Sequence, residues 1–173
     1  RLLSIGRHIE RLDSLAGALR HAITCGLVHE QPGFDAVLKL FGSTISFHAQ
    51  FQQSRTPQAL VELLVSSPDN PRALSWVAKT LRSRLLRMEH LADGATQRLA
   101  ALLPGPEVLQ ASAETLWPID TREPELLLAW LTRYQGMARQ ARPQVEQPAL
   151  GHVEGVNASG RVHQRAQGQC LAA

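Results

Sequence analysis

The residues best suited to chemistry in this sequence are an acid and a base that stand side by side near its start. Glu10 and Arg11 lie in the segment GRHIERLDSLAGALR, residues 6–20, and a second arginine, Arg7, precedes Arg11 by one helical turn. A carboxylate beside two guanidinium groups could take a proton from an amine substrate or bind a charged ligand. The cluster of Arg7, Glu10 and Arg11 is therefore the candidate catalytic site, although the segment could equally be the outer face of a core helix.

The same segment contains two glycines, which a plain surface helix does not favour. Helical geometry places four residues within about 60° of arc: Gly6, Glu10, Asp13 and Gly17. Because glycine lets a second backbone come close, a helix packed there would enclose the two carboxylates, which would then need a cation. We expect Glu10 and Asp13 to form buried ion pairs with an arginine from another helix, with Arg72 and Arg82 as candidates. The alternatives are a solvated face on which Arg7 pairs with Glu10, and a ligand or catalytic site.

The run Asp69-Asn70-Pro71-Arg72 predicts a turn that leads into a helix. Asn70 can cap the helix with its side-chain oxygen, and Pro71 suits the first helical position because its missing N–H is not needed there. The alternative is an anion site, in which the free N–H groups of the helix start act together with Arg72.

Positive charge is concentrated between residues 71 and 103. Six basic residues lie there against two acidic ones: Arg72, Lys79, Arg82, Arg84, Arg87 and Arg98. The formal net charge of the whole chain is only +3, so the excess belongs to this one segment. We interpret it as a solvated face or a face that docks a partner, and a nucleic-acid-binding surface is the alternative.

No spacing in the sequence supports a metal or cofactor site. His21 and Cys25 stand one helical turn apart, but two further zinc ligands are not in view. The Glu-x-x-His pairs of ferritin-like bundles, the Gly-x-Ser-x-Gly turn of hydrolases and a glycine-rich phosphate loop are all absent from the sequence. We therefore expect no metal and no cofactor in this chain.

The elements that position these residues are expected to be helices throughout. Apolar residues recur at alternating spacings of three and four, and strand-like alternation never continues for more than a few residues. In the first helix this spacing predicts one buried seam of apolar residues: Ile5, Ile9, Leu12, Ala16, Leu19 and Ile23. The expected helices span residues 2–25, 34–51, 57–66, 71–103, 107–116 and 124–142. The predicted fold class is all-α, an up-down helical bundle with one long central helix at 71–103. Residues 1–142 would form the bundle, and residues 143–173, which lack an apolar period, a disordered tail.

Length and composition agree with one ordinary domain. The chain has 173 residues, of which 44% are hydrophobic, enough for a real core. No apolar run approaches the roughly 20 residues that span a bilayer, and the first 20 residues lack the apolar stretch of a signal peptide, so we expect a cytoplasmic protein. The sequence begins at Arg1, inside a helical pattern, and we expect it to be a piece of a longer domain.

Three segments, in order, resemble the alpha-E family, a bacterial helical domain named for its Glu-Arg motif. LLSIGRHIERLDSLAGALR is similar to its Gly-Arg-x-x-Glu-Arg helix, FDAVLKLFGSTISFHAQF to its helix that ends in a Ser-x-Thr-Tyr-Arg-like run, and VELLVSSPDNPRALSWVAKTLRSRL to its Asp-x-Asn-Pro-Arg-Ser-Leu segment. Members usually carry the Glu-Arg helix twice, so this chain resembles the C-terminal half.

The sequence departs from the family pattern at one point. Phe47 and His48 stand where the family run has Tyr and Arg, which removes donors suited to a carboxylate or phosphate. The candidates for binding an anion or a partner are then Asn70, Arg72, Arg82 and His48.

The resemblance implies a role beside an ATP-grasp enzyme. Alpha-E domains occur next to, or fused to, circularly permuted ATP-grasp domains, in gene neighbourhoods with transglutaminase-like proteases, and are associated with peptide-bond synthesis or peptide tagging. We expect a non-catalytic accessory module whose partner ligase activates a carboxylate as an acyl phosphate, with ATP and magnesium bound by that partner. A small basic nucleic-acid-binding domain is the alternative, and an enzyme site on Arg7, Glu10 and Arg11 a weaker one.

Overall fold

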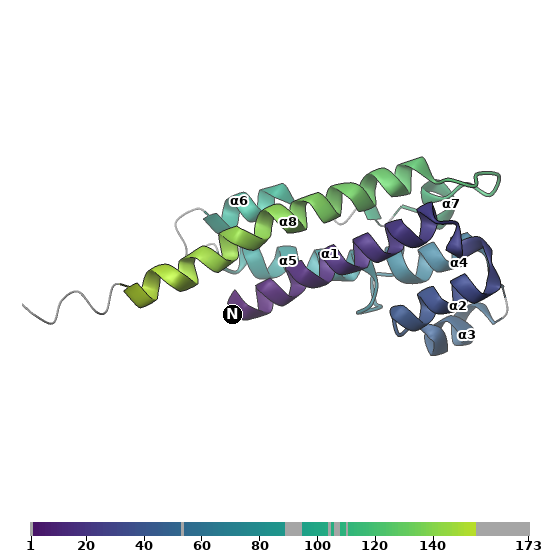
Figure 1. Ribbon diagram of the computed structural model, residues 1–173, viewed down its shortest axis with the longest axis horizontal. Helices are drawn as coiled ribbons and strands as arrows, with labels where there is room; N and C mark the ends of the chain where they lie inside the picture. Colours follow the sequence, from purple (N-terminus) through teal and green to yellow (C-terminus); the bar gives the residue numbers. More distant parts are fainter. Residues whose placement is uncertain are drawn as a thin grey trace, which may run out of the picture.

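The protein is an all-α bundle, as the sequence predicts. The computed structural model describes residues 2–52, 54–88, 95–103, 105, 108–109 and 111–154, and these residues contain helices and no strand. In chain order the elements are α1 (Leu2–Thr24), η1 (Leu27–His29), α2 (Gln31–Leu40), α3 (Thr44–Phe51), α4 (Pro57–Val61), η2 (Glu62–Ser66), α5 (Leu74–Leu86), α6 (Ala95–Leu102), α7 (Ala113–Leu116) and α8 (Glu125–Glu154). Figure 1 shows α1 and α8 side by side, α5 behind α1, and α2, α3 and α4 gathered at one end.

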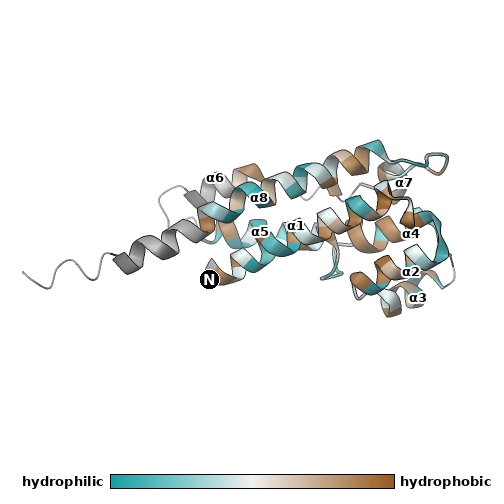
Figure 2. Cartoon of the chain, viewed as in Figure 1, coloured by the Kyte–Doolittle hydropathy of each residue, from teal (hydrophilic) through white to brown (hydrophobic). Residues whose placement is uncertain are grey.

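The helix α1 is the centre of the bundle and packs mainly on α8 and on α5. Its predicted apolar seam exposes at most 3% of any side chain: Ile5, Ile9, Leu12, Ala16, Leu19 and Ile23. The helix ends one residue before the predicted point, and Gly26, which has a φ of 70°, lets the chain turn away. Hydrophilic and hydrophobic residues alternate along α1 and α8 in Figure 2, as expected for helices buried on one side.

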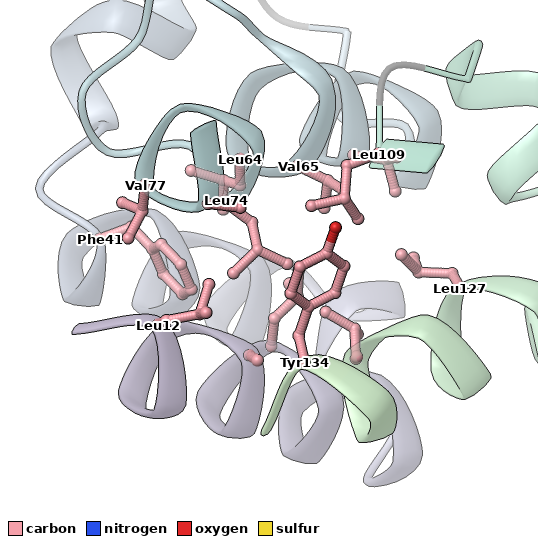
Figure 3. Close-up of a cluster of buried hydrophobic side chains, with 14 of the residues drawn as sticks. Leu12, Phe41, Leu64, Val65, Leu74, Val77, Leu109, Leu127 and Tyr134 are labelled. Carbon is pink, nitrogen blue, oxygen red and sulfur yellow. The ribbon is translucent and has the colours of Figure 1, made fainter. Parts of the chain in front are cut away.

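Two large aromatic side chains fill the core. Tyr134 of α8 is fully buried, with Leu74, Leu109 and Leu127 around its ring in Figure 3, and its hydroxyl donates to the carbonyl of Gly105 at 3.4 Å. Trp117 is equally buried, and its indole N–H donates to the carbonyl of Thr121 at 2.8 Å. Each ring therefore buries a large apolar area while its polar atom keeps a hydrogen bond.

The second predicted helix is two helices. The chain leaves the helical path after Leu40 and begins α3 at Thr44, because Gly42 adopts a φ of 61° that a continuous helix does not allow. Ser43 is buried at this corner and donates from its hydroxyl to the carbonyl of Phe41 at 3.3 Å.

The prediction of one long helix at 71–103 was wrong. Within the described residues this segment contains α5 and α6, which pack on each other, and residues 89–94 between them lie outside the described residues. The start was also misplaced: α5 begins at Leu74, and Asn70 belongs to a turn before it. Apolar residues keep the same rhythm across both helices because each buries one face, so the period alone could not reveal the break.

The last helix continues beyond its predicted end at Arg142. α8 passes through Pro143 and ends at Glu154, so the first 12 residues of the predicted tail are helical. Residues 155–173, the remainder of that tail, lie outside the described residues. In the predicted helix 107–116, α7 occupies only Ala113–Leu116. None of the described helices is long and apolar enough to cross a membrane.

Candidate functional site

A polar ladder joins α1 to α8 along the face that carries Glu10. Arg142 donates from Nη2 to Oε1 of Glu10 at 2.8 Å, and one turn further Arg139 donates from Nε to Oδ1 of Asp13 at 3.3 Å. Residue numbers rise on α1 while they fall on α8, so the helices are antiparallel. This is the second helix that the glycine pattern led us to expect beside Glu10 and Asp13.

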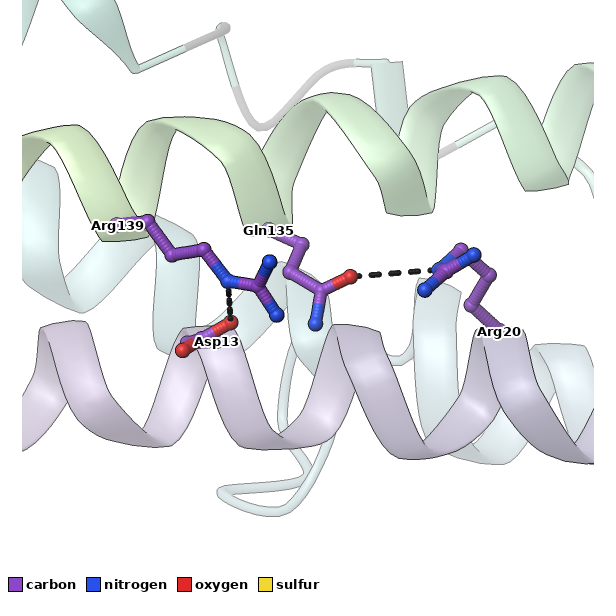
Figure 4. Close-up of polar contacts among 4 residues, drawn as sticks. All are labelled: Asp13, Arg20, Gln135 and Arg139. Carbon is purple, nitrogen blue, oxygen red and sulfur yellow. Dashed lines mark hydrogen bonds and ion pairs between the residues drawn. The ribbon is translucent and has the colours of Figure 1, made fainter.

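Of the two glycines, only Gly17 lies where a side chain of α8 comes close to the backbone of α1. A Cβ atom added to Gly17 would collide with the side-chain amide of Gln135 on α8, whereas one added to Gly6 would meet no atom within 4 Å. The Gln135 amide oxygen accepts a hydrogen bond from Nε of Arg20 at 3.3 Å, which extends the ladder (Figure 4).

The ion pairs differ from the predicted ones in partner and in burial. Their arginines are Arg139 and Arg142 of α8, and not Arg72 or Arg82 of the basic segment. Glu10 and Arg142 each expose 55% of the side chain, and the Asp13 and Arg139 side chains expose 29% and 65%. The pairs are thus solvated, and each contributes less than about 1 kcal/mol to stability.

The two arginines that flank Glu10 take no part in the ladder. Arg7 and Arg11 are exposed, and across the described parts of the chain neither forms an ion pair or side-chain hydrogen bond. The alternative pair of Arg7 with Glu10 is not formed. On α1, Arg7 and Arg11 lie about 60° and 100° around the helix from Glu10 on the exposed side, while the Glu10 carboxylate pairs with Arg142 of α8.

An open groove of about 720 Å³ runs along the outer face of α5. Its apolar surface comes from Ile5, Trp76 and Met88, and its cations are Lys79, Arg84 and Arg87. Four residues at helical spacing follow the groove: Trp76, Lys79, Ser83 and Arg87. Asp69 is the one carboxylate among the described residues that line the groove, against the three cations, so this described lining is positive in sum.

The start of α1 forms one side of this groove. Arg84 donates from Nη1 to the hydroxyl of Ser4, and the ring of His8 stacks on Trp76 with centroids 6.5 Å apart and planes 28° apart. His8 is itself fixed by a hydrogen bond from Nδ1 to the Ser4 carbonyl at 2.7 Å. These contacts hold Trp76 and Arg84 in place, which leaves Lys79 and Arg87 exposed for a ligand.

The candidate residues for binding an anion lie on three parts of the fold, the turn before α5, α5 itself and α3. Asn70 uses both polar atoms of its side chain inside the turn: Oδ1 accepts from the N–H of Arg72 at 3.0 Å, and Nδ2 donates to the carbonyl of Leu63 at 2.9 Å. His48 is exposed on α3, where its Nδ1 donates to the carbonyl of Gln52 at 3.2 Å. Arg82 is half-buried and forms no ion pair with any described residue.

His21 and Cys25 do lie together at the end of α1. The cysteine sulfur is 3.7 Å from both ring nitrogens of His21, and a hollow of about 270 Å³ beside it is lined by His29, Arg122 and Glu123. No group of three metal-binding side chains occurs among the residues that the structure describes.

Sequence reasoning overlooked three of the residues that matter most here. Trp76 could have been found from its spacing, because it stands three and eleven residues before Lys79 and Arg87 on one helical face. Arg142 was predicted only as the end of a helix and Arg139 was not singled out, because no local signal shows that the two arginines face α1.

The fold and the site define a class of protein: an all-α bundle whose first helix carries a Glu-Arg pair. A family model described as a predicted alpha-helical domain with a conserved ER motif, Alpha-E, matches residues 1–148, and the chain belongs to this family. Glu10-Arg11 is the one Glu-Arg dipeptide in the sequence and is therefore the ER motif. No curated protein and no solved structure matches the chain.

Proposed function

We propose that this chain is a non-catalytic helical interaction module of an ATP-grasp-type peptide ligase or peptide-modification system. The observation that carries the proposal is the groove on α5, which combines an apolar surface with exposed cations. Trp76 supplies a large ring, and Lys79 and Arg87 supply positive charge that no described carboxylate neutralises by an ion pair. Interfaces commonly pair such an apolar centre with charges that attract the opposite sign on the partner.

The resemblance to alpha-E proteins supports the choice of partner. An ATP-grasp enzyme would bind ATP and magnesium and activate a carboxylate as an acyl phosphate, while this module would hold a protein surface against it. A transglutaminase-like protease of the same system is a second candidate partner. The family relationship supports only the identity of the partner, and the groove supports only the inference that this chain binds another protein.

The proposal is tested by binding between the full chain and an ATP-grasp protein encoded beside it. Lys79→Glu reverses one charge in the groove, and Lys39→Glu makes the same change on α2, where the lysine is also exposed. We expect Lys79→Glu to weaken binding by about tenfold or more, because an attraction becomes a repulsion, and Lys39→Glu to leave it within twofold. Calorimetry or co-elution on a sizing column measures both, and equal behaviour of the two variants, or no binding by the native chain, would contradict the proposal.

A nucleic-acid surface is the second candidate, and the position of Trp76 among cations favours it. An indole between lysine and arginine is the arrangement on which single-stranded bases stack. One face of this indole is already covered by His8, which leaves less of the ring for a base. Titration of the chain with a single-stranded oligonucleotide at two salt concentrations separates the candidates, because binding through phosphates weakens steeply with salt. If no binding occurs at low salt, this candidate is removed.

A further inference from the structure

The two residues of the ER motif point to different neighbours. Successive residues on a helix are about 100° apart, so Glu10 and Arg11 cannot face the same helix. Glu10 faces α8 and accepts the hydrogen bond from Arg142 at 2.8 Å. Arg11 faces away from α8, is exposed, and makes no side-chain hydrogen bond or ion pair within the described ranges.

The fold therefore accounts for Glu10, whereas Arg11 has no side-chain hydrogen bond or ion pair among the described residues. The family description calls the ER motif conserved. The contact with α8 explains the conservation of Glu10, but replacing Arg11 would break no hydrogen bond or ion pair that its side chain makes within the described part of the chain. A conserved, exposed arginine with no such partner there indicates a binding residue.

The position of Arg11 connects it to the groove on α5. Ser4, His8 and Arg11 are spaced by four and three residues, so they form one stripe along α1. The first two members of the stripe contact α5, through Arg84 and Trp76 respectively. The contacts run from Ser4 with Arg84 to His8 with Trp76, so α1 and α5 are antiparallel and Arg11 lies past the Trp76 end of the groove.

We infer that Arg11 extends the cationic edge of the groove and binds, together with Lys79 and Arg87, an acidic amphipathic segment of the partner protein. This inference rests on the proposed interaction role. The planar guanidinium can hold a carboxylate through two parallel hydrogen bonds, and Trp76 offers the apolar surface that the other face of such a segment needs. Trp76 and Arg87 are 11 residues apart on α5, or about 16 Å along the helix, which about three turns of a partner helix would cover.

The chain's own C-terminal residues do not have the right charge to fill the groove. Residues 155–173 contain Arg161 and Arg165 and no Asp or Glu. Their positive charge would be repelled by Lys79, Arg84 and Arg87, so the charge complement favours a separate acidic partner.

The test uses the full chain and a labelled 15-residue helical peptide that carries leucines on one face and glutamates on the other. A matched peptide has glutamine in place of every glutamate. In fluorescence anisotropy titrations we expect Arg11→Gln to weaken binding of the acidic peptide about tenfold, the loss of one charge-assisted pair. Arg11→Lys is expected to recover only part of that loss, because it keeps the charge but not the fork, and Lys39→Gln to have no effect.

Three further readouts separate the possible outcomes. The melting temperature of Arg11→Gln should equal that of the native chain, which distinguishes a binding role from a structural one. Equal effects of Arg11→Gln and Lys39→Gln, or equal binding of the two peptides, would overturn the inference, as would tighter, Arg11-dependent binding of an oligonucleotide. If Lys79→Glu weakens binding of the ATP-grasp protein and Arg11→Gln does not, only this inference fails. If binding of the acidic peptide depends on Arg11 but the ATP-grasp protein does not bind the chain, only the choice of partner fails.

Discussion

Single residues on the face between α1 and α8 determine the register in which the two helices pack, but they contribute little to the stability of the fold. The contacts of Glu10 with Arg142 and of Asp13 with Arg139 are satisfied together in one register only. A shift of α8 by one turn would bring Asp13 opposite Arg142 and leave Glu10 without a cation. Because each pair is exposed, its contribution to stability is small, yet the difference between two pairs and one still favours the observed register.

Replacement of Glu10 tests this view at the scale of one residue. We expect Glu10→Gln to lower the free energy of unfolding by at most about 1 kcal/mol, and by less in high salt, because an exposed pair is screened. Urea denaturation at low and high salt measures the change, with Glu62→Gln as the control, since Glu62 is exposed and its carboxylate forms no ion pair with any described residue. A loss above about 3 kcal/mol would mean that Glu10 behaves as a buried charge.

At the scale of the element, one glycine determines where a helix ends, and another is a position where a different residue would stabilise its helix. Gly42 ends the path from α2 with a φ of 61°, and a Cβ there would also approach Nε of Arg72 to 3.3 Å. Gly6 lies inside α1, where a Cβ would meet nothing within 4 Å. Alanine is therefore expected to destabilise the protein in place of Gly42 and to stabilise it in place of Gly6.

Alanine at each glycine tests that expectation. Gly42→Ala should destabilise the protein by about 1 kcal/mol or more, because a left-handed conformation is unfavourable for a residue with a Cβ. Gly6→Ala should stabilise it by about 0.5–1 kcal/mol, because alanine is the better helix former. Thermal unfolding followed by circular dichroism gives both values, and a stabilising Gly42→Ala would contradict the assigned turn.

The sequence predicts the faces of these helices better than their ends. The seam of α1 was predicted residue by residue because burial imposes the period directly. The corner at Gly42 lies inside the helix predicted at 34–51, because a single glycine can lie inside a helix or end it and the sequence does not decide between the two. The continuation of α8 past Pro143 was missed because the residues after it carry no apolar period from which a helix could be predicted. The partners of Glu10 and Asp13 were not predictable, because contact between residues more than 120 positions apart depends on how α8 packs.

At the scale of the whole molecule, α1 divides two surfaces of different character. On the side towards α8, the carboxylates of Glu10 and Asp13 form ion pairs. On the side towards α5, Lys79 and Arg87 are exposed, and neither forms an ion pair with a described residue. Both surfaces depend on one core, because the seam of α1 is buried against α5 and α8 at once. The bundle should therefore unfold as a single cooperative unit, in which damage on the α8 side also releases the groove on α5.

Leu131→Ala is the direct test of that coupling. Leu131 is fully buried on α8, so its truncation should lower the free energy of unfolding by about 2–5 kcal/mol, a large part of the stability of an ordinary domain. With Trp130 of α8 replaced by phenylalanine in both proteins, Trp76 and Trp117 report on α5 and on the segment after α7, while circular dichroism reports on all helices. In one cooperative unit the two signals shift by the same amount of urea. If the fluorescence transition stays in place while the helical signal moves, the two sides of α1 fold separately, and the groove could then be carried by a smaller fragment than the whole bundle.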